Sequence, residues 1–338
     1  MKTDSSLAPP PSSSPVKKAL KTLLIICAVG IPVYALFRNL PAVIEATRSA
    51  DFLAVTYVGL GLLVYTIVNA SIWADVLKAL GWRGDRLLAT RTWIQCEAMK
   101  WLPGGIWGYA SRVVKAPEIG TNRTIAGASL MAELLLTIAA WAILAAVGLW
   151  LDGVLLDRLR ETVTSASGSE RGHFLFWAVP VFALLGVGLL VSLPPVRRFI
   201  IKKLSPLSIA SWRVGPLVQA FVSYLALCAL HAILLVILVS AIKLGEFTWA
   251  SAAAADGSAW LIGFFAIGVP GGIGVREAGI TWFLSSYMST PEAMAVAVLW
   301  RTLQVLAELA ALFLSSLLRE PTEKKNLLSE ASSEFPSE

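Results

Sequence analysis

Long apolar segments recur along the 338-residue chain, and they constrain its fold more than any other feature. A helix that crosses a bilayer needs about 20 mostly apolar residues, because its backbone must satisfy its own hydrogen bonds in lipid. Six segments meet this length, namely residues 20–37, 52–73, 125–150, 174–193, 217–242 and 293–318. They predict an all-α, polytopic membrane protein with about six spanning helices.

The composition agrees with this class. Hydrophobic residues make up 57% of the chain and charged residues 15%, whereas soluble domains carry about 25% charged residues. The thirteen Trp suit a protein with two membrane interfaces. The three Cys have no metal-ligand spacing and suggest no disulfide framework, so no metal or other cofactor is expected.

Basic residues cluster in alternate loops, which orients the chain. The net charge of +6 comes from these loops, so we expect no nucleic acid partner. Lys17, Lys18 and Lys21 lie before or at the start of the first apolar segment, which we interpret as an uncleaved signal anchor. We therefore expect a multi-pass protein of the plasma (inner) membrane with cytoplasmic N- and C-termini. Its parts would be a disordered tail (1–16), a membrane domain (17–318) and a disordered cytoplasmic tail (319–338).

Two further apolar segments, 92–114 and 250–288, are interrupted by the same tetrapeptide. Pro-Gly-Gly-Ile occurs at residues 103–106 and again at 270–273. Proline and glycine end helices, and free backbone at membrane depth is tolerated only inside protein or beside a wet cavity. Each segment would either enter and leave from one side as a re-entrant segment or cross fully as a kinked helix.

The two interrupted segments have matching neighbours. Segments 52–73, 92–114 and 125–150 form one unit, and 217–242, 250–288 and 293–318 form another. The positive-inside rule makes the two units enter from opposite sides. This is the inverted repeat of many transporters, whose substrate site lies where paired discontinuous helices meet.

Glycines at the breaks are candidate site residues. Gly104, Gly105, Gly271 and Gly272 would free backbone groups, and a helix that starts after Gly274 would present amides that attract phosphate. The alternative is that these glycines only permit close helix packing.

Charged side chains within the apolar segments are further candidates, because a charge at bilayer depth costs roughly 2.5–3.5 kcal/mol and normally faces a cavity or a partner. Arginine suits a phosphodiester because its planar fork donates two hydrogen bonds. Phosphate binding is therefore assigned to Arg112, Arg276 and Arg301. The residues expected to neutralise them or to bind a cationic headgroup are Glu97, Glu133 and Glu277. The alternative is a set of ion pairs that lock helices together, which applies most to Glu308.

The motifs at both breaks resemble those of a known membrane family. PGGIGVRE at residues 270–277 is followed by VLWRTLQVLAEL at 298–309, and the first break reads EAMKWLPGGIWGYASR at 97–112. These strings resemble the transmembrane, flippase-like region of lysylphosphatidylglycerol synthetases and its stand-alone relatives. The resemblance covers roughly residues 17–318 and lacks the soluble synthetase domain. It implies handling of a lipid with an anionic or modified headgroup.

The sequence therefore predicts a membrane lipid flippase or transporter that moves such a lipid between leaflets. Its partners would be a membrane phospholipid or glycolipid and a separate lipid-modifying enzyme. No nucleotide-binding loop of the form GxxxxGK[ST] is present, so movement would be downhill or coupled to an ion or proton.

Two alternative functions remain. One is an integral-membrane transferase with a lipid-linked donor, in which Asp256, Glu277 or Glu97 acts as base or metal ligand. The other is a non-catalytic partner of a lipid-modifying enzyme.

Overall fold

A computed structural model describes residue 44 and residues 50–102, 106–167, 212–242, 247–266 and 272–317, with side chains described up to residue 162 in the second of these ranges. Within these residues every regular secondary-structure element is a helix, and there are no strands. The expected spans 20–37 and 174–193 and the tails 1–16 and 319–338 lie outside the described residues.

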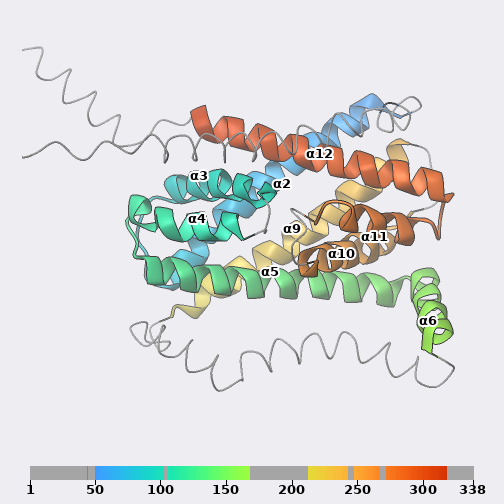
Figure 1. Cartoon of the computed structure of the whole chain (residues 1–338), viewed down its shortest axis with the longest axis horizontal. Coiled ribbons are helices and arrows are strands. Elements are labelled where there is room, and N and C mark those ends of the chain that lie inside the picture. The colour runs from blue at the N-terminus through green and yellow to red at the C-terminus, as the bar shows by residue number, and fades with distance from the viewer. Residues whose placement is uncertain are drawn as a thin grey trace, which may run out of the picture.

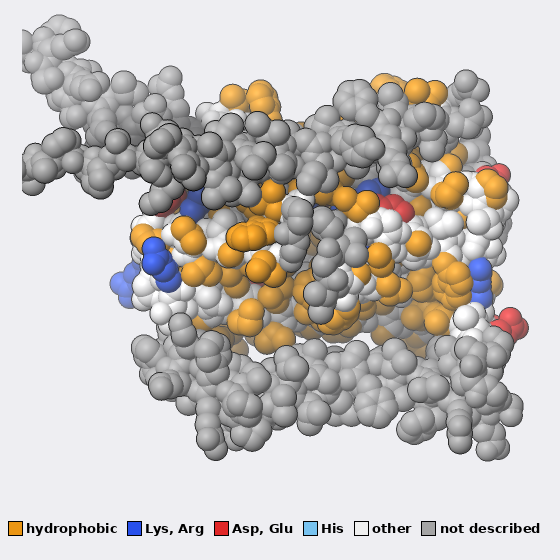
Figure 2. Space-filling model, viewed as in Figure 1, with side chains coloured by type: hydrophobic (Ala, Val, Ile, Leu, Met, Phe, Trp, Pro, Cys, Tyr) orange, Lys and Arg blue, Asp and Glu red, His pale blue; other side chains and the backbone are white. Residues whose placement is uncertain are grey.

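Four helices are long and apolar enough to cross a membrane. They are α2 (Phe52–Ala79), α5 (Arg123–Leu151), α9 (Val214–Ala241) and α12 (Thr290–Leu317). Four of the six expected spans are thereby confirmed as long apolar helices, and the protein is compatible with a multi-pass membrane protein. On the face drawn in Figure 2, hydrophobic side chains cover the middle, while charged side chains lie mostly toward the two ends of the long axis.

Polar residues begin several of these helices. Asp51 accepts hydrogen bonds from the amides of Leu53 and Ala54 at the start of α2. Asn122 accepts one from Ile125 at the start of α5. A side-chain oxygen at this position satisfies amides that have no partner in the first helical turn. Local sequence therefore determines where these membrane helices begin.

Helices α2 and α9 pack antiparallel and are joined reciprocally at their ends. The amide of Asp51, just before α2, donates to the carbonyl of Ala241, the last residue of α9 (2.9 Å). The amide of Arg213, just before α9, donates to the carbonyl of Ala79, the last residue of α2 (2.9 Å). The residue before each helix is therefore bonded to the last residue of the other helix in the same way.

The helices that follow α2 and α9 are shorter and interrupted. After α2 come α3 (Arg86–Glu97), the 3-10 helix η1 (Ala98–Trp101), α4 (Trp107–Lys115) and the 3-10 helix η2 (Ala116–Ile119). After α9 come α10 (Trp249–Phe265) and α11 (Val275–Leu284). The longest of these has 17 residues, so each is shorter than the ~20 residues that a perpendicular crossing needs.

The interrupted pairs lie at opposite ends of the bundle. Figure 1 shows α3 and α4 toward one end of the long axis and α10 and α11 toward the other, with α5 and α12 running along its length. The contacts correspond when α2 is matched with α9, α3 with α10, and α5 with α12. Helix α5 then packs on α10 as α12 packs on α3, and α2 packs on α12 as α9 packs on α5. Eight of the described α-helices thus form two corresponding sets of four, α2 to α5 and α9 to α12.

Small residues bring α5 and α10 close together. A methyl group on Gly148 would lie 2.3 Å from the amide nitrogen of Ala254, and one on Gly257 would lie 3.0 Å from Ala145. Small side chains of this kind let helix backbones approach closely within a bilayer. The close crossing places the inner end of α10 beside the middle of the bundle.

A polar junction lies where α5 ends and α6 (Gly153–Ser167) begins. Asp152 Oδ2 accepts hydrogen bonds from Ser251 Oγ and Tyr287 Oη, each at 2.5 Å, and Oδ1 accepts one from the amide of Leu155 at 3.0 Å. Burial alone would raise the pKa of Asp152, but the bonds from Ser251 and Tyr287 outweigh it and bring the pKa below its ordinary value. One carboxylate therefore joins α5, α10 and the α11–α12 connection.

Candidate functional site

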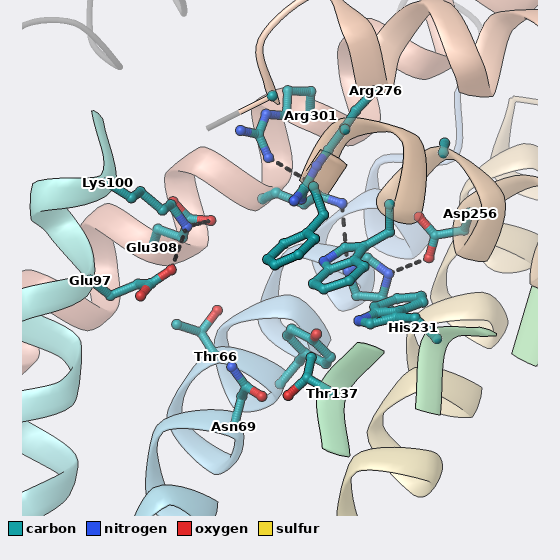
Figure 3. A pocket seen from close by; sticks show the side chains of 18 of the residues that line it. Thr66, Asn69, Glu97, Lys100, Thr137, His231, Asp256, Arg276, Arg301 and Glu308 are labelled. Atoms are coloured by element: carbon teal, nitrogen blue, oxygen red, sulfur yellow. Dashed lines mark hydrogen bonds and ion pairs between the residues drawn. The ribbon is translucent and has the colours of Figure 1, made fainter. Parts of the chain in front are cut away.

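A cavity of about 360 Å³ lies between the two sets of helices and receives side chains from every one of the four long helices and from both interrupted pairs. Figure 3 shows its polar side chains converging from different helices. The charged and polar residues that line it are Thr66, Asn69, Glu97, Lys100, Arg112, Glu133, Thr137, His231, Asp256, Arg276, Glu277, Arg301, Gln304 and Glu308.

Arg112 and Glu133 form a closed ion pair at one wall. Arg112 Nη1 lies 2.6 Å from Glu133 Oε2, and the indole nitrogen of Trp93 donates to Glu133 Oε1 at 2.8 Å. The guanidinium also lies over the rings of Trp93 and Tyr109, at 5.3 and 5.2 Å. Only 1% of the Arg112 side chain is exposed. Its charge is therefore already compensated by neighbouring side chains.

Glu277 and Arg301 connect α11 to α12. Arg301 Nε lies 3.4 Å from Glu277 Oε1, and Arg301 Nη1 donates to Gln304 at 3.1 Å. Glu277 Oε2 also accepts from the amide of Gly274 at 2.6 Å. A helix does start after Gly274, as predicted, but Glu277 occupies its first free amide. The amide of Gly274 is therefore not available to a phosphate.

Arg276 is held differently from the other arginines. Its stem passes between two glycines: a methyl group on Gly263 would lie 2.2 Å from Arg276 Cγ, and one on Gly272 would lie 3.0 Å from Nε. The guanidinium lies 5.4 Å from the centre of the Trp260 ring. Nε is buried, and Arg276 makes no hydrogen bond or ion pair with any residue that the structure describes. The glycines thus make room for a cation that faces the cavity and has no carboxylate partner among the described residues.

Lys100 lies between two carboxylates. Its Nζ is 2.8 Å from Glu308 Oε1 and 3.4 Å from Glu97 Oε1. The second oxygen of Glu308, Oε2, is buried and has no hydrogen-bond partner among the described residues. One ammonium therefore serves two carboxylates, which leaves this cluster with an excess of negative charge.

His231 lies in an aromatic enclosure at another wall. Its Nδ1 is hydrogen-bonded to Asp256 Oδ2, and the indole nitrogen of Trp300 donates to Asp256 Oδ1 at 3.3 Å. The imidazole lies 4.6 Å from the ring of Tyr65 and 4.8 Å from that of Trp300. A histidine that is isolated in the sequence is therefore part of a buried acid–base pair.

The structure places every described residue of the predicted site on this one cavity. These residues are Glu97, Arg112, Glu133, Gly272, Arg276, Glu277 and Arg301. Gly104, Gly105 and Gly271 lie outside the described residues. Glu133 and Arg301 both line the cavity, but Glu133 is paired with Arg112.

Sequence reasoning missed several polar and aromatic residues of α2, α5 and α10. Thr66, Asn69 and Thr137 lie at the lower side of the cavity in Figure 3. Trp141 and Trp260 stack on each other with ring centres 5.4 Å apart. Polar residues at positions 66 and 69, one helical turn apart in an apolar segment, were the signal that could have identified the α2 wall.

Among the described residues, no three His, Cys, Asp or Glu side chains are grouped so that they could hold a metal ion. Neither a scan against profiles of known protein families nor a search of curated proteins finds a match for this chain. Its function must therefore be argued from the cavity itself.

Proposed function

We propose that the protein is a membrane lipid transporter that moves a phospholipid or related lipid, with an anionic or modified headgroup, from one leaflet to the other. The headgroup would pass through the charged cavity, while the acyl chains stay in the bilayer. The observation that carries this proposal is a cavity lined by charged residues from both interrupted helix pairs inside an otherwise apolar bundle.

The arrangement of helices supports alternating access. We interpret the two sets of four helices as an inverted repeat, in which α3–α4 and α10–α11 are re-entrant segments that enter from opposite sides. The reciprocal bonds between α2 and α9 support this interpretation. In transporters built this way, the substrate site lies near the membrane midplane, where the two repeats meet.

The outer surface supports a path for acyl chains. Large apolar side chains of α2 are exposed on one face: Phe52, Tyr57, Leu60, Val64 and Val68. These positions recur every three to five residues and form one helical face. Such a face suits contact with lipid, while Thr66 of the same helix faces the cavity.

Arg276 would bind the phosphate, because it is the cavity cation that lacks a carboxylate partner among the described residues. Arg301 would assist it from α12, on the same side of the cavity. Arg112 would act as a structural counter-charge to Glu133, since its guanidinium is enclosed by aromatic rings.

Lipid translocation can be measured in liposomes that contain a phospholipid labelled with a fluorophore on an acyl chain, quenched from outside with dithionite. The wild-type protein should raise the quenched fraction above that of protein-free liposomes. Arg276→Gln should slow transport by about tenfold, because a charged hydrogen bond of roughly 1.5–3 kcal/mol is lost. Arg83→Gln, on an exposed loop, is the matched control. Equal rates for the Arg276 variant and the control would refute the role of Arg276, and no transport by the wild type would refute the proposed function.

A second candidate function rests on the His231–Asp256 pair, which places a potential general base in the cavity. A transferase with a lipid-linked donor could use such a base to activate an acceptor hydroxyl. Incubation of purified protein with candidate donors, followed by mass spectrometry of the lipids, separates the two functions. A transporter leaves the lipid chemically unchanged, whereas a transferase yields a product that His231→Ala should abolish.

A further inference from the structure

Among the described residues, a cation and an anionic cluster at different places in the cavity lack a full ion-pair partner. Among the described carboxylates of the cavity, Glu133 is paired with Arg112 and Glu277 with Arg301, while the two oxygens of Asp256 are hydrogen-bonded to His231 and Trp300. The excess cation is Arg276. The excess anion belongs to the cluster in which Glu97 and Glu308 share Lys100.

The same two places carry unsatisfied buried atoms of complementary kind. Arg276 Nε is a donor without an acceptor, and Glu308 Oε2 is an acceptor without a donor among the residues described. A buried polar atom without a partner costs roughly 1–3 kcal/mol. A ligand that brings an acceptor to Arg276 and a donor to Glu308 would remove both costs at once.

The two atoms do not satisfy each other. Figure 3 shows Arg276 at one side of the cavity and the group of Lys100, Glu97 and Glu308 at another. Trp260 holds the Arg276 guanidinium by a cation–π contact, and Gly263 and Gly272 fix the course of its stem. Lys100 fixes the opposite group. The separation of charge is therefore built into the site.

We infer that the cavity recognises a zwitterionic lipid headgroup in which a phosphodiester is joined to a primary ammonium, with the phosphate on Arg276 and the ammonium on Glu308 and Glu97. This inference rests on the proposed lipid transport and narrows it to one headgroup class. A phosphodiester offers the acceptor that Arg276 needs, and its fork binds such oxygens in pairs. An N–H of the ammonium supplies the donor that Glu308 Oε2 needs.

The cavity size agrees with such a group. Small-molecule sites commonly have volumes of roughly 300–1,000 Å³, and this cavity has about 360 Å³. A quaternary ammonium would fit the charge but has no N–H to donate. The site therefore discriminates between a primary ammonium and its trimethylated form.

The first experiment compares three acyl-labelled lipids with identical chains in liposomes that contain the wild-type protein. We expect phosphatidylethanolamine to move about tenfold faster than phosphatidylglycerol and faster than phosphatidylcholine, as the loss of one charged hydrogen bond implies. Soluble glycerophosphoethanolamine at millimolar concentration should inhibit this movement, which would show that the headgroup is recognised. Equal or faster movement of phosphatidylglycerol would overturn the inference and leave the proposed function intact. If none of the three lipids moves, both the inference and the proposed function are refuted.

A second experiment assigns the two ends of the headgroup. Glu308→Gln should slow phosphatidylethanolamine about tenfold and leave phosphatidylglycerol within about twofold, because only the amine loses its carboxylate. Arg276→Gln should slow both lipids. Glu118→Gln, at an exposed position of η2, is the matched control for Glu308. A Glu308 variant that slows both lipids equally would contradict the assignment. Glu97→Gln repeats the test and keeps Glu308, which is the carboxylate closer to Lys100.

Discussion

At the residue scale, the cavity shows that charges of one type can have different roles. Arg112 is enclosed by Trp73, Trp93 and Tyr109 and paired with Glu133. Arg276 also lies against an aromatic ring but has no carboxylate within ion-pair distance among the described residues. Breaking a buried pair leaves an uncompensated charge, whereas removing an unpaired cation leaves none. The two arginines should therefore differ in what their loss affects.

Replacement of Arg112 is expected to affect stability first. Arg112→Met should destabilise the protein by about 3–5 kcal/mol, because Glu133 remains buried without its partner. The double variant with Glu133→Leu should recover part of this loss. Thermal unfolding in detergent measures both, with Arg83→Met as control. If Arg112→Met has the same melting temperature as the wild type, the Arg112–Glu133 pair does not stabilise the contact between α4 and α5.

At the element scale, close helix packing depends on single glycines. A methyl group on Gly148 would contact backbone of α10, with the amide nitrogen of Ala254 at 2.3 Å and the carbonyl oxygen of Ala250 at 2.7 Å. Backbone cannot yield as a flexible side chain can. The separation of α5 and α10 is therefore set by the absence of a side chain.

Gly148→Ala should consequently destabilise the protein by about 1–3 kcal/mol, the usual cost of overpacking. Gly127→Ala is the matched control, because it lies on the same helix and its added methyl group would meet nothing within 4 Å. The control should match or exceed the wild-type melting temperature, since alanine favours a helix over glycine. Equal melting temperatures for the two variants would contradict the close crossing of α5 and α10.

The junction at Asp152 should make stability depend on pH. The folded-state pKa of Asp152 is lowered, so its contribution is fully present above the ordinary aspartate pKa of about 3.9 and is lost as pH falls through the lower folded value. Asp152→Asn should therefore be less stable than the wild type at neutral pH, and the difference should shrink below about pH 4. Unfolding midpoints measured across pH 3–7 check this, and a constant difference over that range would contradict it.

At the scale of the whole molecule, the two breaks should open toward opposite sides of the membrane. Ile106 and Ile273 hold corresponding places after the two Pro-Gly-Gly sequences and are 63% and 36% exposed. In a variant with Cys27, Cys96 and Cys228 replaced by serine, Ile106→Cys should react with a membrane-impermeant maleimide from the cytoplasmic side only. Ile273→Cys should react from the other side only.

Labelling of both cysteines from one side would contradict the inverted repeat while leaving the cavity unaffected. Transport by the cysteine-free background is the control, because it shows that the labelled protein is functional.

Much of this architecture could be predicted from the sequence. Apolar length alone identified α2, α5, α9 and α12, because a spanning segment must satisfy its backbone internally and present apolar side chains to lipid. Proline and glycine chemistry located both interruptions within a few residues. The cost of burying charge indicated that residues such as Glu133, Arg276 and Arg301 would converge on a shared interior.

The pairing of those charges was decided only by tertiary structure. Glu133 meets Arg112, and Glu308 meets Lys100 from a segment 208 residues away in the chain. Helical periodicity states which side chains share a face, but it does not state which helix that face meets. Close crossings of helices such as α5 with α10 determine that choice, and they also leave Arg276 without a carboxylate partner among the described residues. The sequence by itself therefore determined a broken, charge-bearing membrane bundle, and the packing of its helices decided which charges remain available to a ligand.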